Sequence, residues 1–97
     1  MLDSFVVTHE GSYSVAFLVS CYVGETHREG RPAGFSDYNA AVQYLFEVQK
    51  EAINDGFRVS GDPLNRAITL HDPDGNTETY VLSETSDLRQ LRKATYH

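Results

Sequence analysis

A set of mostly apolar residues takes every second position near the start of the chain and alternates with a mixed set that includes two serines, and this pattern predicts a β-strand. Between residues 13 and 23 (YSVAFLVSCYV) one set takes every second position: Tyr13, Val15, Phe17, Val19, Cys21 and Val23. A period of two places this set on one face, which we expect to pack on the core. Residues 5–9 (FVVTH) predict an earlier strand, and the short connection around Gly11 predicts a hairpin between the two.

The next apolar positions follow a helical period. Residues 24–34 (GETHREGRPAG) contain three glycines, a proline and charges of both signs, which predict a loop. Ser36 then fits an N-cap and Gly56 fits a C-terminal stop, so we expect a helix that ends near Asp55. Its apolar stripe consists of Tyr38, Ala41, Val42, Leu45, Gln49, Ala52 and Ile53, with Tyr44 and Phe46 flanking it.

Three short strands are expected after the helix. They are residues 57–61 (FRVSG), 66–71 (RAITLH) and 78–83 (ETYVLS), and turns that contain proline or glycine separate them. Pairing through these turns predicts a core face of Phe57, Val59, Ile68, Leu70, Thr79 and Val81. The opposite face would carry Arg58, Ser60, Ala67, Thr69, His71, Glu78, Tyr80 and Leu82, with His71 and Glu78 as cross-strand neighbours.

A last helix is expected after Thr85 or Ser86, and it would end near Lys93. The predicted order of elements is therefore ββαβββα. This order describes a single α+β domain over residues 1–97, with an antiparallel sheet packed on the long helix. The strands could form one continuous sheet or two adjoining sheets. Ninety-seven residues can bury a core without the help of a metal or a disulfide.

The charge of the chain is strongly acidic. Fourteen Asp and Glu residues face eight Lys and Arg residues, for a net charge of −6. Three of the bases, Arg89, Arg92 and Lys93, lie in the last ten residues, which leaves fourteen acids against five bases in residues 1–87. Such a field repels nucleic acid and anionic membranes and attracts basic protein surfaces. The alternative is that the charge only keeps the domain soluble.

The single cysteine, Cys21, excludes an internal disulfide and fits a reducing cytoplasm. It falls on the apolar face of its strand, where a thiol is usually an inert small hydrophobic group. The longest apolar stretch, at residues 15–19, is far too short to span a membrane.

No residue pattern points to catalysis, and we expect neither an enzyme nor a bound cofactor or metal. Cys21 and His9 are the nearest approach to a catalytic pair, but the hairpin register separates them along the strands. The four histidines lack metal-ligand spacing, and residues 72–76 (DPDGN) fit a turn better than a calcium loop. Arg28 and Arg31, in the loop before the helix, are a candidate anion site, with a charged loop and no ligand as the alternative.

Residues 36–93 follow the αβββα order of double-stranded-RNA-binding domains. That family needs lysines at the start of its second helix, where this chain has the acidic residues 83–87 (SETSD). We therefore expect no direct binding of nucleic acid.

Tyrosines and carboxylates together point to a protein-binding surface. The chain has six tyrosines, and we expect Tyr22 and Tyr80 on the sheet faces away from the core and Tyr44 near the edge of the helix. Tyrosine between carboxylates suits a partner rich in Arg and Lys. The alternative is that the tyrosines complete the core and the acids solvate the exterior. The candidate partner-binding residues are Glu47, Glu51, Asp72, Asp74, Glu78, Tyr80 and Glu84.

The stretch DGNTETYVLSE, residues 74–84, follows a helix and two strands and leads into the expected last helix. In this it resembles small acidic phage-encoded anti-CRISPR proteins, one type of which has a similar Asp-Gly-Asn turn, Tyr-Val strand and Ser-Glu exit. The resemblance covers about the second half of the chain. It implies an inhibitor that works without catalysis in the host cell cytoplasm and occupies the basic groove or recruitment surface of an effector nuclease.

Two functions of different classes follow as hypotheses. The first is a soluble inhibitor or adaptor that docks an acidic, tyrosine-bearing face on a basic nucleic-acid-handling protein. The second is a small structural or regulatory subunit, such as a homodimer, that self-associates through an exposed strand edge.

Overall fold

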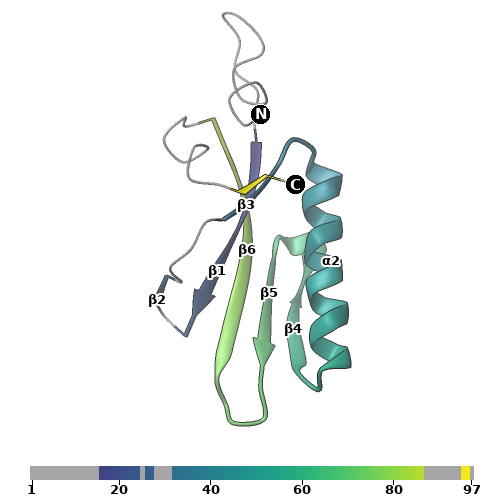
Figure 1. Ribbon diagram of the computed structural model, residues 1–97, viewed down its shortest axis with the longest axis vertical. Coiled ribbons are helices and arrows are strands. Elements are labelled where there is room, and N and C mark those ends of the chain that lie inside the picture. The colour runs from purple at the N-terminus through teal and green to yellow at the C-terminus, as the bar shows by residue number, and fades with distance from the viewer. Residues whose placement is uncertain (1–15, 25, 28–31, 87–94, 97) are drawn as a thin grey trace, which may run out of the picture.

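The described part of the chain forms one sheet with an α-helix on one of its faces (Figure 1). The computed structural model describes residues 16–24, 26–27, 32–86 and 95–96. The main strands are β1 (Ala16–Val23), β3 (Ala33–Phe35), β4 (Arg58–Asp62), β5 (Ala67–His71) and β6 (Thr77–Thr85). They lie in the order β4-β5-β6-β1-β3, and every neighbouring pair among them is antiparallel.

The expected class, α+β with an antiparallel sheet on one long helix, is confirmed, and the sheet is continuous. The three strands predicted after the helix are present, and β6 extends two residues beyond its predicted end. The strand predicted at residues 5–9 and residues 87–93 of the predicted last helix lie outside the described residues.

Two further strands of two residues each attach to this sheet. β2 (Thr26–His27) pairs antiparallel with the end of β1, and β7 (Thr95–Tyr96) pairs parallel with β3. Because the sequence predicted a loop over residues 24–34, β2 and the start of β3 correct that prediction. Strands of two or three residues are too short to show a period, and the surrounding glycines and proline indicate turns.

The helix α2 (Tyr38–Asn54) begins and ends close to the predicted residues. Its N-cap is Asp37 rather than Ser36, because the Asp37 carboxylate accepts a hydrogen bond from the backbone N–H of Ala40 at 3.1 Å. This bond satisfies one of the unpaired N–H groups in the first turn. At the other end Gly56 has a φ of 90°, a left-handed geometry that glycine adopts at low cost after a helix.

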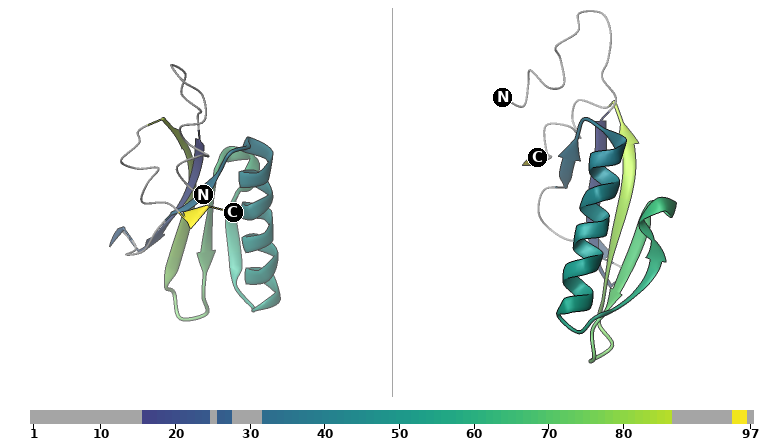
Figure 2. Two further views of the ribbon diagram at one scale, coloured as in Figure 1. Left: turned by 45° about the horizontal axis from the view of Figure 1, so that its top comes forward. Right: turned by 90° about the vertical axis from the view of Figure 1, so that its right-hand side faces the viewer.

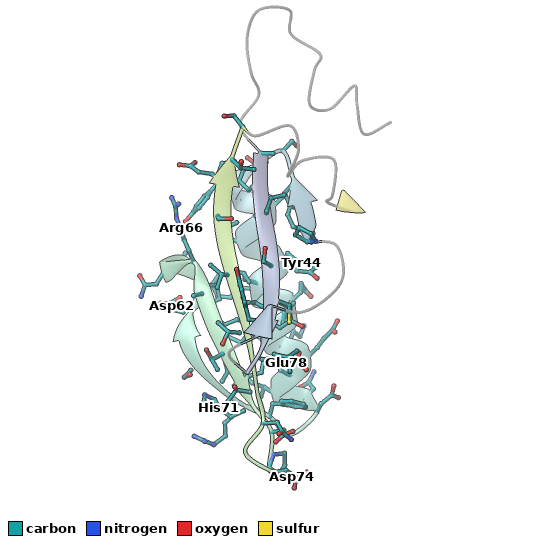
Figure 3. The ribbon with its side chains drawn as sticks, turned by 90° about the vertical axis from the view of Figure 1, so that its left-hand side faces the viewer. Tyr44, Asp62, Arg66, His71, Asp74 and Glu78 are labelled. Atoms are coloured by element: carbon teal, nitrogen blue, oxygen red, sulfur yellow. The ribbon has the colours of Figure 1, made fainter. Side chains whose placement is uncertain are left out.

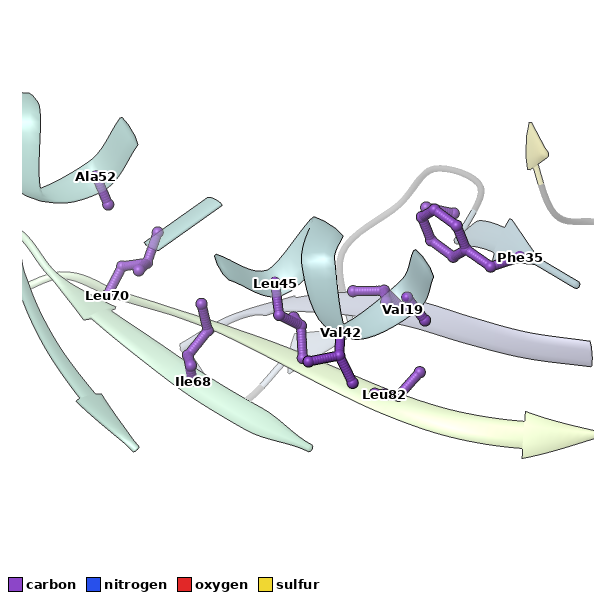
Figure 4. Packing of buried hydrophobic residues seen from close by; sticks show 10 residues of the cluster. Val19, Phe35, Val42, Leu45, Ala52, Ile68, Leu70 and Leu82 are labelled. Carbon is purple, nitrogen blue, oxygen red and sulfur yellow. The ribbon is translucent and has the colours of Figure 1, made fainter. Parts of the chain in front are cut away.

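Apolar side chains of α2 and the sheet form the core between them (Figure 4). Leu45 of α2 and Ile68 of β5 are both 0% exposed. Ile53, which the sequence assigned to the helix stripe, is 55% exposed. It lies about 80° around the helix from Leu45, at the margin of the buried face. The buried cluster consists of Val19, Ala33, Phe35, Ala41, Val42, Leu45, Ala52, Ile68, Leu70 and Leu82.

The pairing of β5 with β6 differs by one residue from the expected pairing. His71 lies opposite Thr77, and Leu70 lies opposite Glu78, so the prediction that His71 and Glu78 are cross-strand neighbours is wrong. The turn explains the difference, because the backbone N–H of Asp72 donates to the carbonyl of Asn76 at 3.0 Å. This bond closes a turn of five residues, residues 72–76. The residues that flank the turn, His71 and Thr77, then lie opposite each other.

A shift of one residue exchanges the two faces of a strand. Tyr80 and Leu82 therefore lie on the helix side of β6, where Leu82 is 3% exposed and Tyr80 packs against the core cluster. Their predicted place on the opposite face is wrong. Thr79 and Val81, which were predicted to face the core, lie on the side away from α2.

The described members of the set predicted to face the core lie on one face of β1, but Val23, at the end of the strand, is 46% exposed rather than packed on the core. Phe17, Val19 and Cys21 lie on the helix side, and Tyr22 lies on the other side, which we call the far face. Ala16 and Leu18 also point to the far face and are 0% and 3% exposed, although they stand apart from the main cluster. The β1 strand is therefore buried on both faces over its first half.

Polar side chains pair across strands elsewhere on the far face. The Ser60 hydroxyl lies 2.9 Å from Nε2 of His71, and the hydroxyls of Thr69 and Thr79 lie 3.0 Å apart. These two contacts link β4 to β5 and β5 to β6. Figure 2 shows from two further sides that α2 covers only one face of the sheet.

Candidate protein-binding face

The turn between β5 and β6 is held by the carboxylate of Asp72. It accepts hydrogen bonds from the backbone N–H groups of Asp74 and Asn76, both at 2.9 Å, and from Nδ2 of Asn76 at 3.1 Å. A carboxylate at the first position of such a turn replaces backbone partners that the turn lacks. Asp72 therefore has a structural role, whereas Asp74 is exposed at the tip.

Asp72 is expected to titrate below the ordinary range of an aspartate. The side-chain hydrogen bond from Asn76, followed by the backbone bonds of the turn, lowers its pKa from the usual value of 3.8. A carboxyl with a depressed folded-state pKa contributes stability that is present above its unfolded pKa and is lost as the pH falls through the folded pKa. A ¹³C NMR titration of the carboxyl groups measures this directly.

The substitution Asn76→Ala is the matched variant for this titration. It removes the largest cause of the shift while the Asp72 side chain stays in place, so the pKa of Asp72 should rise toward its usual value. An Asp72 carboxyl that titrates normally in the unaltered protein would contradict the turn geometry described above.

Glu78, Tyr80 and Cys21 form a small polar cluster on the helix side of the sheet. The Tyr80 hydroxyl donates to Oε1 of Glu78 at 3.4 Å, and the Cys21 thiol contacts the same oxygen at 3.9 Å. Burial, with Cys21 and Glu78 adding to it, raises the pKa of Tyr80 well above its usual value. Tyr80 is therefore a neutral phenol, half-buried and held in place, rather than the exposed residue that the sequence predicted.

Two more of the candidate acids lie on α2, beside a tyrosine. Tyr44 packs on Phe35 of β3, with ring centroids 5.2 Å apart, which fixes the flank of the helix that faces β3. Glu51 follows Tyr44 by seven residues and so projects from nearly the same flank, and Glu47 projects about 60° from Tyr44. Both glutamates are exposed.

Figure 3 shows the two sides of the sheet together. Tyr44 and Glu78 lie on the helix side, and His71 and Asp62 lie on the far face. The structure thus brings together the α2 acids, Tyr44, Tyr80 and Glu78, with the tip of the β5–β6 hairpin at one end. We call this side the acidic face. It consists of Tyr44, Glu47, Glu51, Asp74, Glu78 and Tyr80.

Glu84, which the sequence also named as a partner-binding residue, lies apart from the acidic face. It lies on the helix side of β6, opposite Phe17, and it is exposed. Six residues of extended strand separate it from Glu78, which corresponds to about 20 Å. The sequence placed both residues on one contact surface, and only a partner that spans the length of the sheet would meet both.

Two of the three described Lys and Arg residues lie away from the acidic face, and the third, Lys50, lies at its margin. Lys50 follows Glu47 by three residues and so projects about 60° around the helix from that glutamate and about 120° from Tyr44. Arg58 points to the far face, and the guanidinium of Arg66 stacks over the ring of Tyr38 at 5.3 Å. The acidic face therefore carries more acids than bases among the described residues, which their order in the sequence does not reveal.

Most of the residues that the sequence named for catalysis or anion binding lie outside the described part of the chain. Among the residues that the structure describes, no group of three or more His, Cys, Asp or Glu side chains is arranged to hold a metal ion. His9, Arg28 and Arg31, which the sequence named for catalysis and anion binding, lie outside the described residues. The start of α2, next to the candidate anion loop, is already capped by the carboxylate of Asp37.

Comparison with protein-family models, with curated proteins and with solved structures gives no match for this chain. In the portion that the structure describes, every helix is too short or too polar to cross a membrane.

Proposed function

We propose that this protein is a non-catalytic binding module that docks its acidic face on a basic protein surface. The observation that carries the proposal is the excess of acids over bases on one side of the described residues. Two tyrosines and the exposed glutamates of α2 share one side with Glu78, while Arg58 and Arg66 point elsewhere and only Lys50 lies at the margin of that side. A one-sided arrangement of this kind steers and orients a basic partner, which evenly mixed surface charge does not.

The acidic face combines tyrosines that contact neighbouring side chains with exposed glutamates. Tyr44 rests on Phe35, and Tyr80 is tied to Glu78, so both rings are ordered before a partner arrives. Aromatic groups held in place lose little entropy on binding and accept cation–π contacts from arginine. Glu47 and Glu51 are exposed, so their carboxylates are accessible to a guanidinium or ammonium group of the partner.

The partner that fits best is a nucleic-acid-handling protein. Proteins of this class present clusters of Lys and Arg to phosphate groups, and an acidic protein surface can compete for the same cluster. The resemblance of residues 74–84 to phage-encoded anti-CRISPR proteins supports a CRISPR effector nuclease as the target. An inhibitor of this kind would act in the host cytoplasm.

The double substitution Glu47→Gln and Glu51→Gln is expected to weaken binding to a basic partner. A short peptide of alternating arginine and glycine serves as the defined probe. Loss of two exposed charges should lower the affinity roughly three- to tenfold at about 0.1 M salt. The difference should vanish at about 1 M salt, where the Debye length is about 3 Å. Titration followed by ¹⁵N NMR measures both the affinity and the residues that shift.

A second double variant, Asn65→Lys and Ser83→Lys, controls for the change in net charge. It shifts the charge by the same amount, at two exposed positions outside the acidic face. The control should bind the peptide more tightly than the glutamine variant, and peptide-induced shifts should centre on Tyr44, Glu51 and Glu78. Equal weakening in both variants would show that only the total charge matters, and the proposal would then be wrong.

A further inference from the structure

The strand β4 forms one edge of the sheet. Among the described strands it pairs only with β5, and its other side carries backbone groups that none of those strands pairs. Arg58, Ser60 and Gly61 are exposed along it. Unpaired N–H and C=O groups in a row bind another extended strand better than they bind any other structure, so the edge itself specifies the kind of partner.

The sequence of β4 is complementary to itself when read in the opposite direction. In an antiparallel pair centred on Ser60, Arg58 of one chain lies opposite Asp62 of the other, and the same contact recurs on the other side of the centre. The side chains of Arg58, Ser60 and Asp62 all point to the far face. Opposite charges directly across an antiparallel pair stabilise it, and both members of each pair would share one face.

The helix above this edge presents apolar side chains on the same side of the molecule. Tyr44 marks the flank of α2 that faces β3, and Phe46 and Ile53 project from the opposite flank. They are 37% and 55% exposed. The right-hand view of Figure 2 looks onto this side, where α2 lies beside β4.

We propose that two copies of this protein associate through β4 as a symmetric antiparallel pair centred on Ser60. The two-fold axis would run through Ser60, perpendicular to the sheet. Both sheets then join into one, and both α2 helices lie on the same face. Phe46 and Ile53 of one copy approach those of the other above the joined strands, and the two Arg58–Asp62 pairs form beneath them.

The edge strand and the acidic face lie on opposite flanks of α2, so a variant in one leaves the other intact. Gly61 is avoided as a test position because a Cβ there would lie 2.6 Å from the backbone oxygen of Ala67 in its own chain. Any substitution at Gly61 would disturb the monomer before it reached an interface.

The first test compares two equivalent substitutions by sedimentation equilibrium. Ser60→Lys places two like charges next to each other on the two-fold axis and should raise the dimer dissociation constant at least about tenfold. Ser83→Lys introduces the same side chain at an exposed position on the same sheet face, but on the interior strand β6. It should leave the dimer unchanged. A circular dichroism melt confirms that each variant folds.

The second test examines the register through complementary charges. Arg58→Glu places a glutamate opposite Asp62, and Asp62→Lys places a lysine opposite Arg58, so each variant alone should be monomeric. Mixed together, they restore both opposite-charge pairs and should form a one-to-one heterodimer, which native mass spectrometry resolves by mass. Asp62 also accepts a hydrogen bond from the backbone N–H of Leu64 at 2.9 Å. Heterodimer formation would show that loss of this bond does not unfold the Asp62 variant.

Three results would overturn the proposal. The unaltered protein could sediment as a monomer at every concentration up to the millimolar range. It could form a dimer that Ser60→Lys leaves intact, which would place the contact on another surface. Finally, two folded charge variants could remain monomeric when mixed, which would exclude the pairing of Arg58 with Asp62.

Discussion

Replacing Leu45 by alanine is expected to lower the free energy of unfolding by about 3 kcal/mol, within the range of roughly 2–5 kcal/mol for buried leucines. Leu45 is 0% exposed and belongs to the cluster that joins α2 to the sheet. Removal of its side chain loses apolar burial and leaves a cavity that the surrounding strands can fill only in part. Urea denaturation at one fixed protein concentration measures the change.

Leu64→Ala is the matched control for this measurement. The chemical change is identical, but Leu64 is 63% exposed in the short 3₁₀ turn η1 (Pro63–Asn65). Exposed positions usually shift the free energy of unfolding by less than about 0.5 kcal/mol. Equal losses in the two variants would contradict the described packing of α2 on the sheet.

The orientation of β6 predicts that alanine substitutions at two neighbouring residues lower the free energy of unfolding by different amounts. Leu82→Ala should cost about 2–5 kcal/mol, because Leu82 is 3% exposed beneath the helix. Val81→Ala should cost about 1 kcal/mol or less, because Val81 is only half-buried on the far face. The register that the sequence predicted reverses this order, since it places Val81 in the core and Leu82 outside. Denaturation of the two variants under one set of conditions therefore distinguishes the registers.

The helix and the class of fold could be predicted from the sequence because their signals are local. The helical period continues for most of α2, and Gly56 marks its end. The N-cap was displaced by one residue because Ser36 and Asp37 are both good caps, and their order alone does not decide between them. Ile53 was assigned to the core because its position lies at the margin of the apolar stripe.

The register of β6 could not be predicted because both of its faces carry apolar residues. Tyr80 and Leu82 alternate with Val81, so either face could pack on the helix. The choice depends on how the turn closes, and that follows from the hydrogen bond between Asp72 and Asn76. A pairing one position away uses the same turn residues, so the turn sequence alone does not decide the register.

The composition of the candidate site was accessible from the sequence, but its geometry was not. Glutamates next to tyrosines indicated an acidic contact surface, and Glu47 and Glu51 are indeed exposed. The contact between Cys21 and Glu78 joins residues 57 positions apart through the pairing of β1 with β6. No local pattern indicates such a pairing, and without it the burial of Tyr80 cannot be foreseen.

Affinity capture from a nuclease-treated bacterial lysate tests most directly whether the acidic face recognises a basic nucleic-acid-handling protein. Three baits are compared at about 0.1 M and about 1 M salt: the unaltered protein, the Glu47→Gln and Glu51→Gln variant, and the Asn65→Lys and Ser83→Lys control. Mass spectrometry identifies and quantifies the retained proteins.

We expect a basic nucleic-acid-handling protein on the unaltered bait at low salt, and its loss from that bait at high salt. The glutamine variant should retain much less of it than the control, although the two differ equally in charge from the unaltered protein. The same proteins in equal amounts on all three baits, or recovery of the bait alone, would contradict recognition by the acidic face.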